Sequence, residues 1–451
     1  MKPSVIFGIL LFVALHAFDE MVLVIVMPTI ASDLGSSEWY GMSIAGYVLA
    51  SIIGMVWAGK QMDQKGPALV LSTACVFFLI GILLAVLSWG TISFFLARVL
   101  QGIGGGMCWT LAFGVISLMA RPEDKPKAVA SMDVAWVIPS LLAPVIGGFM
   151  VEYIHWRWIF AIQLLPLAGA FFLVTPQIRH LTGKQTRGQS NSAIILDASR
   201  IAVGSGLILY FLGTPLGWTW LGIIPAFWCI VKPLDNMMPD NWLKLDGPLS
   251  ASLLVAALAF LTFYGMEAYQ PLYLIEVRNL STLDSGLVLT CASLSWMMAS
   301  QLTARNAIPG NHSQRILIGL SLLLVGVGSL WFLLFSNFGY WTAYVSWMIA
   351  GLGMGVTFNT ARSTAMLHTP PGEEGKVAGG ISLNVSLGLG FAAGLGGAIK
   401  NQAYSYGYTT SEAVSGIWVM SMLAGVLTWL LLFYHYRKHQ RTFAKMADNP
   451  V

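Results

Sequence analysis

Long apolar runs separated by short polar segments are the feature of this sequence that most constrains its fold. A run of about 20 apolar residues is long enough to cross the hydrocarbon core of a bilayer as a helix. Lipid offers no partner to unpaired backbone groups, so only helices and closed barrels span membranes. Barrel strands are about 10 residues long and alternate apolar with polar residues, whereas the runs here are long and continuous. The pattern therefore predicts an all-α integral membrane protein.

The scarcity of charge agrees with this prediction. Only 10% of the 451 residues are charged, whereas a soluble protein carries about 25%. The four cysteines are scattered, and no histidine cluster or matched nucleophile and base occurs. We therefore expect no enzyme activity, no metal, no cofactor and no nucleic-acid partner.

Fourteen apolar segments are long enough, or nearly so, to span a membrane, and the eighth is the shortest. They lie near residues 4–30, 40–58, 69–88, 91–119, 128–152, 158–176, 194–213, 217–231, 249–275, 284–304, 315–335, 340–367, 376–399 and 413–436. This spacing predicts four regions. They are an N-terminal six-helix bundle (1–176), linkers with two extra helices (177–248), a C-terminal six-helix bundle (249–436) and a cytoplasmic tail (437–451).

Lysine and arginine gather on one side of the predicted membrane. With both termini in the cytoplasm, 18 of the 24 basic residues lie in cytoplasmic segments and 3 lie on the opposite side. Basic residues near span ends favour the cytoplasmic side. The first apolar run is also too long for a cleavable signal peptide. The charges thus predict a multi-pass protein of the inner (cytoplasmic) membrane with an even number of spans.

The sequence contains an internal repeat. Residues 102–148 align with residues 351–397 without a gap, and three alternate glycines from Gly102 match three from Gly351. Transporters are often built from repeated helix bundles. The repeat predicts two six-helix bundles related by pseudo-two-fold symmetry, with two inserted helices between them.

A glycine-rich loop joins the second and third spans. It contains Gly59, Asp63 and Gly66. Glycine permits a tight turn, and an aspartate can bond free amides at a helix start. We expect this loop to help gate conformational change, although an ordinary capped turn would have the same residues.

The fifth span carries a proline followed by paired glycines. Pro144 removes a helix hydrogen bond, while Gly147 and Gly148 allow close helix packing. Together they suit an interface between helices that bends or slides, or a plain packing contact.

Two further motifs involve charged residues within spans. The run from Arg98 to Gly102 has the pattern R-x-x-Q-G in the fourth span, and in the first span Asp19 precedes Pro28 by nine residues. With the two glycine motifs, the chain resembles the fourteen-helix drug:proton antiporter branch of the major facilitator superfamily over essentially its whole length. It departs from the family patterns at Gln64 in the loop and at Pro139 in the fifth span.

This resemblance implies a transporter that exports drugs by alternating access, driven by inward proton flow. It also implies that Arg98 takes part in proton transfer. It further implies that the 59–66 loop and the fifth-span motif act in conformational change and antiport.

Acidic residues at membrane depth are the strongest functional signal in the residues themselves. They are Asp19, Glu20, Asp133 and Glu267. Ionisable groups inside a membrane are costly and mark functional sites, and burial favours the neutral form of a carboxyl group. We expect Asp19, with Glu20, to be the protonation site and Arg98 to modulate it. Neighbouring side chains point about 100° apart on a helix, so the two acids cannot face the same way.

Less specific signals complete the expected site. Tyr269, Gln270, Asn359 and Asn384 are candidate polar groups of a substrate cavity. His16 is more typical of a packed core residue than of a functional one. The 17 tryptophans, 23 phenylalanines and 21 methionines suit a lipophilic, cationic ligand, but they also suit lipid contact.

The sequence thus predicts a monomeric exporter whose partners are a small-molecule substrate, protons and the lipid bilayer. One alternative is an exporter of a single endogenous metabolite, such as a siderophore or a peptide. Another is a membrane sensor that transports nothing, which should carry a soluble signalling domain.

Overall fold

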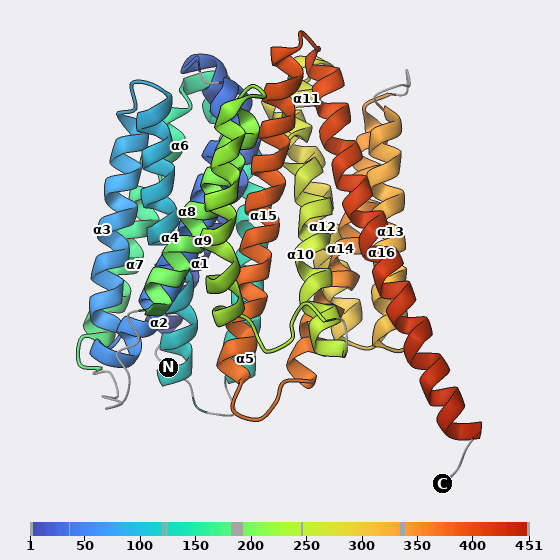
Figure 1. Cartoon of the computed structure of the whole chain (residues 1–451). Coiled ribbons are helices and arrows are strands. Elements are labelled where there is room, and N and C mark those ends of the chain that lie inside the picture. The colour runs from blue at the N-terminus through green and yellow to red at the C-terminus, as the bar shows by residue number, and fades with distance from the viewer. Residues whose placement is uncertain are drawn as a thin grey trace. The chain divides into compact units, whose positions relative to one another are not determined.

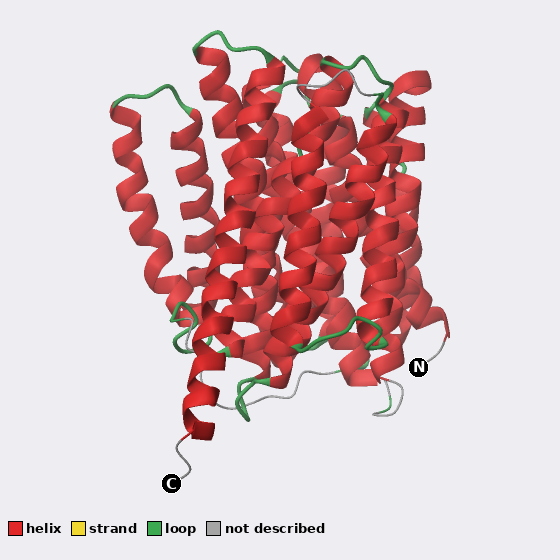
Figure 2. Cartoon of the chain, turned by 90° about the vertical axis from the view of Figure 1, so that its right-hand side faces the viewer, coloured by secondary structure: helices red, strands yellow, loops and turns green. Residues whose placement is uncertain are grey.

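The protein is entirely helical in the part that the computed structural model describes (Figure 2). Backbone is described for residues 3–35, 37–119, 121, 125–181, 193–244, 247–333 and 339–448, with side chains outside the description at 125–131, 133, 134, 137, 333, 435 and 437–448. The all-α prediction is confirmed for these residues.

The helices follow the predicted apolar segments closely (Figure 1). In the first 181 residues they are α1 (Pro3–Asp33), η1 (Ser37–Trp39), α2 (Tyr40–Lys65), α3 (Pro67–Val86), α4 (Thr91–Met119), α5 (Lys125–Phe149), η2 (Met150–Ile154), α6 (Arg157–Ala161) and α7 (Leu164–Ile178). After them come α8 (Ala193–Gly213), η3 (Trp218–Gly222), α9 (Ile223–Met237), α10 (Pro248–Glu267), α11 (Gln270–Glu276), α12 (Thr282–Ala304), α13 (His312–Leu333), α14 (Trp341–Leu367), α15 (Glu374–Ser405) and α16 (Thr410–Asp448).

Eleven helical segments in the described part are long and apolar enough to cross a membrane. Three other predicted spans are helical but lie outside that set. They are α5, the short α9 and α14, which carries Arg362. The chain is thus a multi-pass membrane protein, while the total of fourteen spans stays a prediction.

Two predicted spans are each interrupted by a break. One is interrupted at Ile162, between α6 and α7, and the other at Ala268, between α10 and α11. A proline follows each break, Pro166 in α7 and Pro271 in α11. Proline has no N–H for the carbonyl four residues earlier and its ring crowds that carbonyl. The apolar pattern alone gave no sign of these breaks, whereas the prolines account for them.

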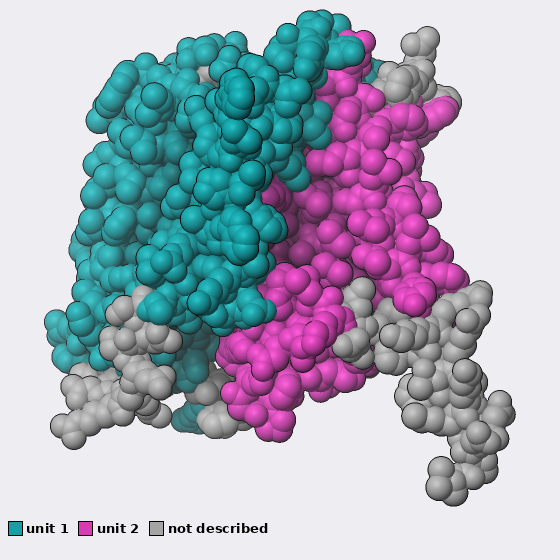
Figure 3. Space-filling model, viewed as in Figure 1, with its two compact units in different colours: residues 1–236, 268–290, 393–410 teal, residues 237–267, 291–392, 411–451 magenta. Residues whose placement is uncertain are grey.

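The chain divides into two compact units, coloured separately in Figure 3. Unit 1 comprises residues 1–236, 268–290 and 393–410, and unit 2 comprises residues 237–267, 291–392 and 411–451. Unit 1 therefore includes α11 and the adjoining ends of α12 and α15. The predicted boundaries at residues 176, 248 and 436 stay a prediction.

The glycines of the repeat pack three helices together in unit 1. A Cβ atom on Gly102 would collide with the main chain of Tyr47 in α2, and one on Gly104 would lie 2.8 Å from the amide nitrogen of Phe78 in α3. Glycine therefore lets α4 touch α2 on one side and α3 on the other (Figure 1).

The matching glycines do the same in unit 2. A Cβ atom on Gly351 would collide with the carbonyl of Ala292 in α12, and one on Gly353 would collide with Leu323 in α13. Each unit thus contains three helices held by the same glycine pattern, as a structural repeat requires. The full two-bundle symmetry stays a prediction.

Candidate functional site

A buried ion pair links α1 and α4 in unit 1. Arg98 Nη1 donates to Asp19 Oδ2 at 2.8 Å, and both side chains are 0% exposed. Asp19 lies in the middle of α1, and Arg98 lies two turns into α4. The structure therefore brings together the two charged residues that the sequence singled out first.

Asp19 accepts hydrogen bonds from two glutamines as well. Gln163 Nε2 donates to Asp19 Oδ1 at 2.9 Å, and Gln101 Nε2 donates to the same oxygen at 3.3 Å. Gln101 Oε1 also accepts a bond from Arg98 Nη1 at 2.8 Å. Asp19 thus accepts hydrogen bonds from three side chains, two of them on α4 and one at the break between α6 and α7.

One of these glutamines belongs to a sequence motif, whereas the other was not predicted to be functional. Gln101 belongs to the R-x-x-Q-G pattern, but it was given no contact with Asp19. Gln163 lies at the break between α6 and α7, where its side chain reaches the pair from a third direction. Its only sequence signal was a lone amide within an apolar span three residues before a proline.

The other predicted acids lie in different surroundings. Glu20 is half-buried on α1 and has no hydrogen bond or ion pair to another described residue. Glu267 is half-buried at the last position of α10 and belongs to unit 2, whereas Asp19 belongs to unit 1. The side chain of Asp133 lies outside the described residues. The Asp19–Arg98 pair is therefore the contact on which the site is built.

Two of the predicted polar cavity groups lie at the break before α11. Tyr269 is fully buried, and its hydroxyl bonds the carbonyl of Ala393 in α15. Gln270 is also fully buried, and its Nε2 donates to the carbonyl of Ser285 at 3.3 Å. Both side chains tie helices together in this conformation, so their role in a substrate cavity stays a prediction.

The other two predicted polar groups lie in unit 2. Asn359 is half-buried, and its Nδ2 donates to Ser300 Oγ at 2.7 Å. Asn384 is buried, and its Nδ2 donates to the carbonyl of Leu253 in α10 at 3.1 Å. Asn359 is therefore the more accessible of the two to a ligand.

The predicted gating loop is almost entirely helix. Gly59 and Asp63 lie in the last turns of α2, and the turn itself is the single residue Gly66. Gly66 has φ +89°, a left-handed conformation that favours glycine, and Pro67 starts α3. Asp63 is exposed, and among the described residues its carboxylate has no hydrogen-bond partner.

The proline and glycines of the fifth span lie between two helices. A Cβ atom on Gly147 would lie 2.9 Å from Val22 in α1, and one on Gly148 would lie 2.7 Å from Leu283 in α12. Pro144 packs against Gly286, also in α12. Close packing at these residues is therefore confirmed, while their role in movement stays a prediction.

A second buried cation lies in the last turns of α15. Lys400 is 1% exposed, and its Nζ donates to the carbonyl of Ser37 at 2.6 Å and to the hydroxyl at 2.8 Å. Asn401 Nδ2 donates to the carbonyl of Glu38 at 2.7 Å. Gln402 Nε2 donates to the carbonyl of Leu212 in α8 at 3.2 Å. We refer to Lys400, Asn401 and Gln402 as the clasp.

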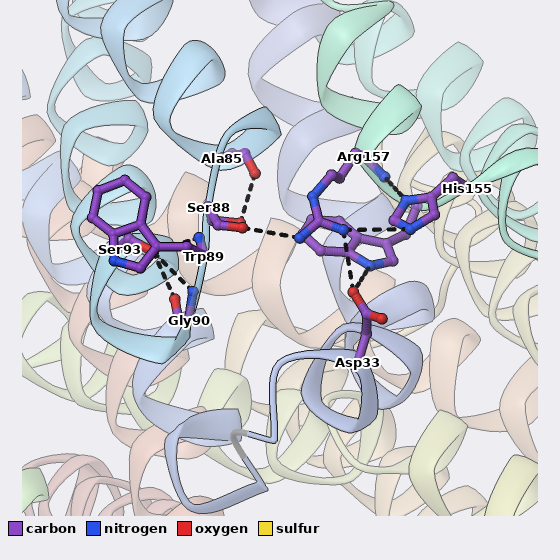
Figure 4. A network of polar contacts seen from close by, with 9 residues as sticks. Asp33, Ala85, Ser88, Trp89, Gly90, Ser93, His155 and Arg157 are labelled. Atoms are coloured by element: carbon purple, nitrogen blue, oxygen red, sulfur yellow. Dashed lines mark hydrogen bonds and ion pairs between the residues drawn. The ribbon is translucent and has the colours of Figure 1, made fainter.

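An exposed polar network lies where α1 ends and α6 begins (Figure 4). Arg157 Nη1 donates to Asp33 Oδ2 at 3.2 Å, and Trp156 Nε1 donates to the same oxygen at 2.8 Å. Arg157 Nη2 also donates to the carbonyl of Ser88, after the end of α3, at 2.9 Å. The network joins loops that the span count places on one side of the membrane.

No group of three or more histidine, cysteine, aspartate or glutamate side chains in the described part of the chain could hold a metal ion. The polar chemistry described here is therefore that of hydrogen bonds and ion pairs.

Curated relatives of the chain are named as drug transporters. It is 24% identical to multidrug resistance protein 3 of Bacillus subtilis over 429 residues, which cover 92% of this chain and 82% of the relative. It is 23% identical to the multidrug efflux pump SdrM of Staphylococcus aureus over 444 residues, which cover 95% and 96%.

Solved transporter structures share the fold. A D-xylose–proton symporter matches with a TM-score of 0.66 at 15% identity, covering 94% of this chain and 97% of the symporter. A peptide transporter bound to alafosfalin matches with a TM-score of 0.70 at 12% identity, covering 96% and 95%. The family model of the Major Facilitator Superfamily matches residues 9–393. The chain therefore belongs to the major facilitator superfamily and is a membrane transporter rather than an enzyme.

Proposed function

We propose that this transporter exports lipophilic compounds, cationic ones included, by alternating access and is driven by inward proton flow. The observation that carries the proposal is the fully buried Asp19–Arg98 ion pair in the middle of α1. An ionisable pair at membrane depth is expensive to keep and marks a functional site. The names of the two bacterial relatives support drug export.

The geometry suggests how a proton would act on this pair. Asp19 accepts hydrogen bonds from Arg98, Gln101 and Gln163. A proton on Asp19 would cancel the attraction to Arg98 and occupy one acceptor site. Contact between α1 and α4 would then weaken, which links protonation to helix movement. Glu20 is half-buried on the same helix and would serve as a second acid.

The remaining sequence predictions belong to the same proposal. Fourteen spans would form two six-helix bundles and two inserted helices, in the inner membrane, with both termini in the cytoplasm and one chain as the working unit. Glu267 would act from the C-terminal bundle, and Asn359 would be a polar contact for the substrate. Asp133 would be a further acid on α5.

The test is transport in proteoliposomes with an imposed pH gradient. We expect Asp19→Asn to lose at least tenfold of the gradient-driven flux of a lipophilic cationic dye, while exchange of the dye without a gradient persists. Asp235→Asn is the matched control because Asp235 is exposed on α9, and it should transport like the unmodified protein. Gradient-driven flux that is unchanged in Asp19→Asn would overturn the proton site.

One relative supports a second candidate function. The chain is 26% identical over 391 residues to a transporter of the acurin A biosynthesis cluster of Aspergillus aculeatus, covering 80% of this chain and 68% of the relative. An exporter of one metabolite would discriminate sharply among substrates. A dye panel in which cationic, neutral and anionic compounds all fail to be transported would favour this function over drug export.

A further inference from the structure

Tyr47 in α2 lies between the buried ion pair and a histidine. Its ring centroid is 4.3 Å from the Cζ atom of Arg98, a cation–π distance. Its hydroxyl is hydrogen-bonded to His16 Nδ1 at 2.5 Å. Tyr47 is 1% exposed and His16 is 6% exposed. The two side chains therefore form one buried unit that touches Arg98.

The packing around this unit leaves no room for another side chain. A Cβ atom on Gly105 in α4 would lie 2.7 Å from both His16 Nδ1 and the Tyr47 hydroxyl. The rings of Trp109 and Trp136 lie 6.2 Å and 6.0 Å from that of His16. The imidazole and the phenol are thus packed closely against α4 at Gly105, with the two indole rings beside the imidazole.

Arg98 depends on this arrangement because little else holds its guanidinium. Only Nη1 has acceptors, Asp19 and Gln101, whereas Nε and Nη2 have none among the described residues. Rings face the guanidinium instead, Tyr47 at 4.3 Å and Phe160 at 5.9 Å. The orientation of the Tyr47 ring therefore helps to set where Arg98 lies relative to Asp19.

We propose that His16 is a positioning residue for proton coupling, acting through its hydrogen bond to Tyr47 rather than by carrying a proton. This inference rests on the proposed function of the Asp19–Arg98 pair. His16 fixes the phenol, the phenol fixes the guanidinium, and the guanidinium favours the charged form of Asp19. The titratable and charged neighbours of this unit are Asp19 and Glu20 in α1 and Arg98 and Cys108 in α4.

Three single variants and one double variant separate positioning from proton carrying. His16→Leu removes the bond to Nδ1 and leaves only the 3.5 Å bond from the Tyr47 hydroxyl to the main-chain carbonyl of residue 16. Tyr47→Phe removes the hydroxyl but keeps the ring, and His16→Asn keeps a hydrogen-bonding atom where Nδ1 lies. We expect the Leu and Phe variants to move the pH profile of gradient-driven transport by the same amount, about one pH unit. The double variant His16→Leu/Tyr47→Phe should move it no further, and His16→Asn should behave like the unmodified protein.

A second readout does not depend on transport. The infrared band of the protonated Asp19 carboxyl, assigned as the band missing in Asp19→Asn, follows the protonation of Asp19 in reconstituted protein. Its midpoint should move to higher pH in His16→Leu and Tyr47→Phe, because a less well placed Arg98 stabilises the carboxylate less. A moved midpoint with transport indifferent to the pH gradient would refute the proposed function and leave the positioning role standing.

Three results would overturn the positioning role itself. His16→Asn could behave like His16→Leu, which would mean that the imidazole itself is required. Tyr47→Phe could leave both the infrared midpoint and the pH profile unchanged. The double variant could add the two single effects, which would mean that His16 and Tyr47 act separately.

Discussion

Unit 1 buries two cations in two different ways. Arg98 meets the carboxylate of Asp19, so the pair is neutral overall. Lys400 meets the carbonyl and hydroxyl of Ser37, and its Nζ lies 4.4 Å from the ring centroid of Tyr404. Among the described residues, no carboxylate lies within ion-pair distance of Lys400. One cation is thus paired directly with a carboxylate, whereas the other is hydrogen-bonded to neutral groups and has Glu276 and Glu38 as more distant opposite charges.

The position of each cation along its helix explains the difference. Arg98 lies two turns inside α4, while Lys400 lies in the last two turns of α15. An arginine stays charged under all ordinary conditions and its burial has to be compensated in place. Lys400 lies near the end of its helix, where it reaches the carbonyl of Ser37 in η1. The first cation thus belongs to an ion pair that a proton on Asp19 would break, and the second holds η1 against the end of α15.

The largest expected effect comes from breaking the buried ion pair on one side only. Asp19→Asn or Arg98→Gln should each lower the free energy of unfolding by about 3–5 kcal/mol, because each leaves a buried charge without a partner. The double variant Asp19→Asn/Arg98→Gln should lose less than either single variant. Unfolding of the micellar protein in a detergent titration measures all three.

Arg157→Gln is the matched control for this series. Its ion pair with Asp33 is partly exposed, at 29% and 43% of the two side chains, and such pairs contribute about 0.2–1 kcal/mol. Additive losses in the Asp19/Arg98 double variant would contradict a charge-compensated pair.

Removing the second cation should have an intermediate effect. Lys400→Met leaves the oxygens of Ser37 without their donor but breaks no ion pair with a buried carboxylate, so we expect a loss of about 1–3 kcal/mol. Hydrogen–deuterium exchange should rise at residues 37–41 and 400–405 and stay unchanged around residue 98. A loss of unfolding free energy as large as that of Arg98→Gln would contradict the proposed difference between the two cations.

A smaller effect tests whether the clasp holds the end of α8. Gln402 donates to the carbonyls of Leu212 and Thr214 at the end of α8. Gln402→Ala should cost about 1 kcal/mol and should raise hydrogen exchange at residues 212–216. Asn401→Ala is the control, because Asn401 donates to Glu38 instead. Equal hydrogen exchange at residues 212–216 in both variants would show that Gln402 does not hold the end of α8.

The helices and the two residues of the central ion pair could be foreseen from the sequence, whereas the polar contacts could not. The length of an apolar run determines whether it can cross a bilayer as a helix, so the runs predict the membrane helices. Asp19 and Arg98 stood out because charge is rare at that depth. The period and length of the apolar runs do not indicate which helices contact each other. The contacts of Gln163 and Tyr47 could therefore not be predicted.

The breaks in two spans and the clasp illustrate a second limit. Pro166 and Pro271 are visible in the sequence, but a proline in a membrane helix either bends it or ends a segment, depending on its neighbours. Lys400 follows the predicted span 376–399, and the span count says nothing of its burial. Its exposed fraction of 1% follows from the contact of Lys400 with Ser37 in η1, 363 residues earlier in the chain.

The smallest effect concerns an exposed ion pair in unit 2, which contrasts with the buried one. Lys376 Nζ donates to Asp240 Oδ1 at 2.7 Å, and the Asp240 side chain is 80% exposed. This hydrogen bond and the charge of Lys376 lower the pKa of Asp240 below its ordinary value. The pair therefore stabilises the fold above the ordinary aspartate pKa, and this contribution is lost as the pH falls through the lowered one.

Asp240→Asn should accordingly destabilise the protein slightly at pH 7, and this destabilisation should shrink as the pH falls through the lowered pKa of Asp240. Salt should abolish the effect at pH 7, because charges in water are screened within about 3 Å at 1 M ionic strength. The destabilisation by Asp19→Asn should persist in the same salt, since no solvent reaches that pair. If salt removed the destabilisation by Asp19→Asn as well as that by Asp240→Asn, water would have to reach Asp19 in the folded protein. The Asp19–Arg98 pair would then not be a buried pair in contrast to the exposed Asp240–Lys376 pair.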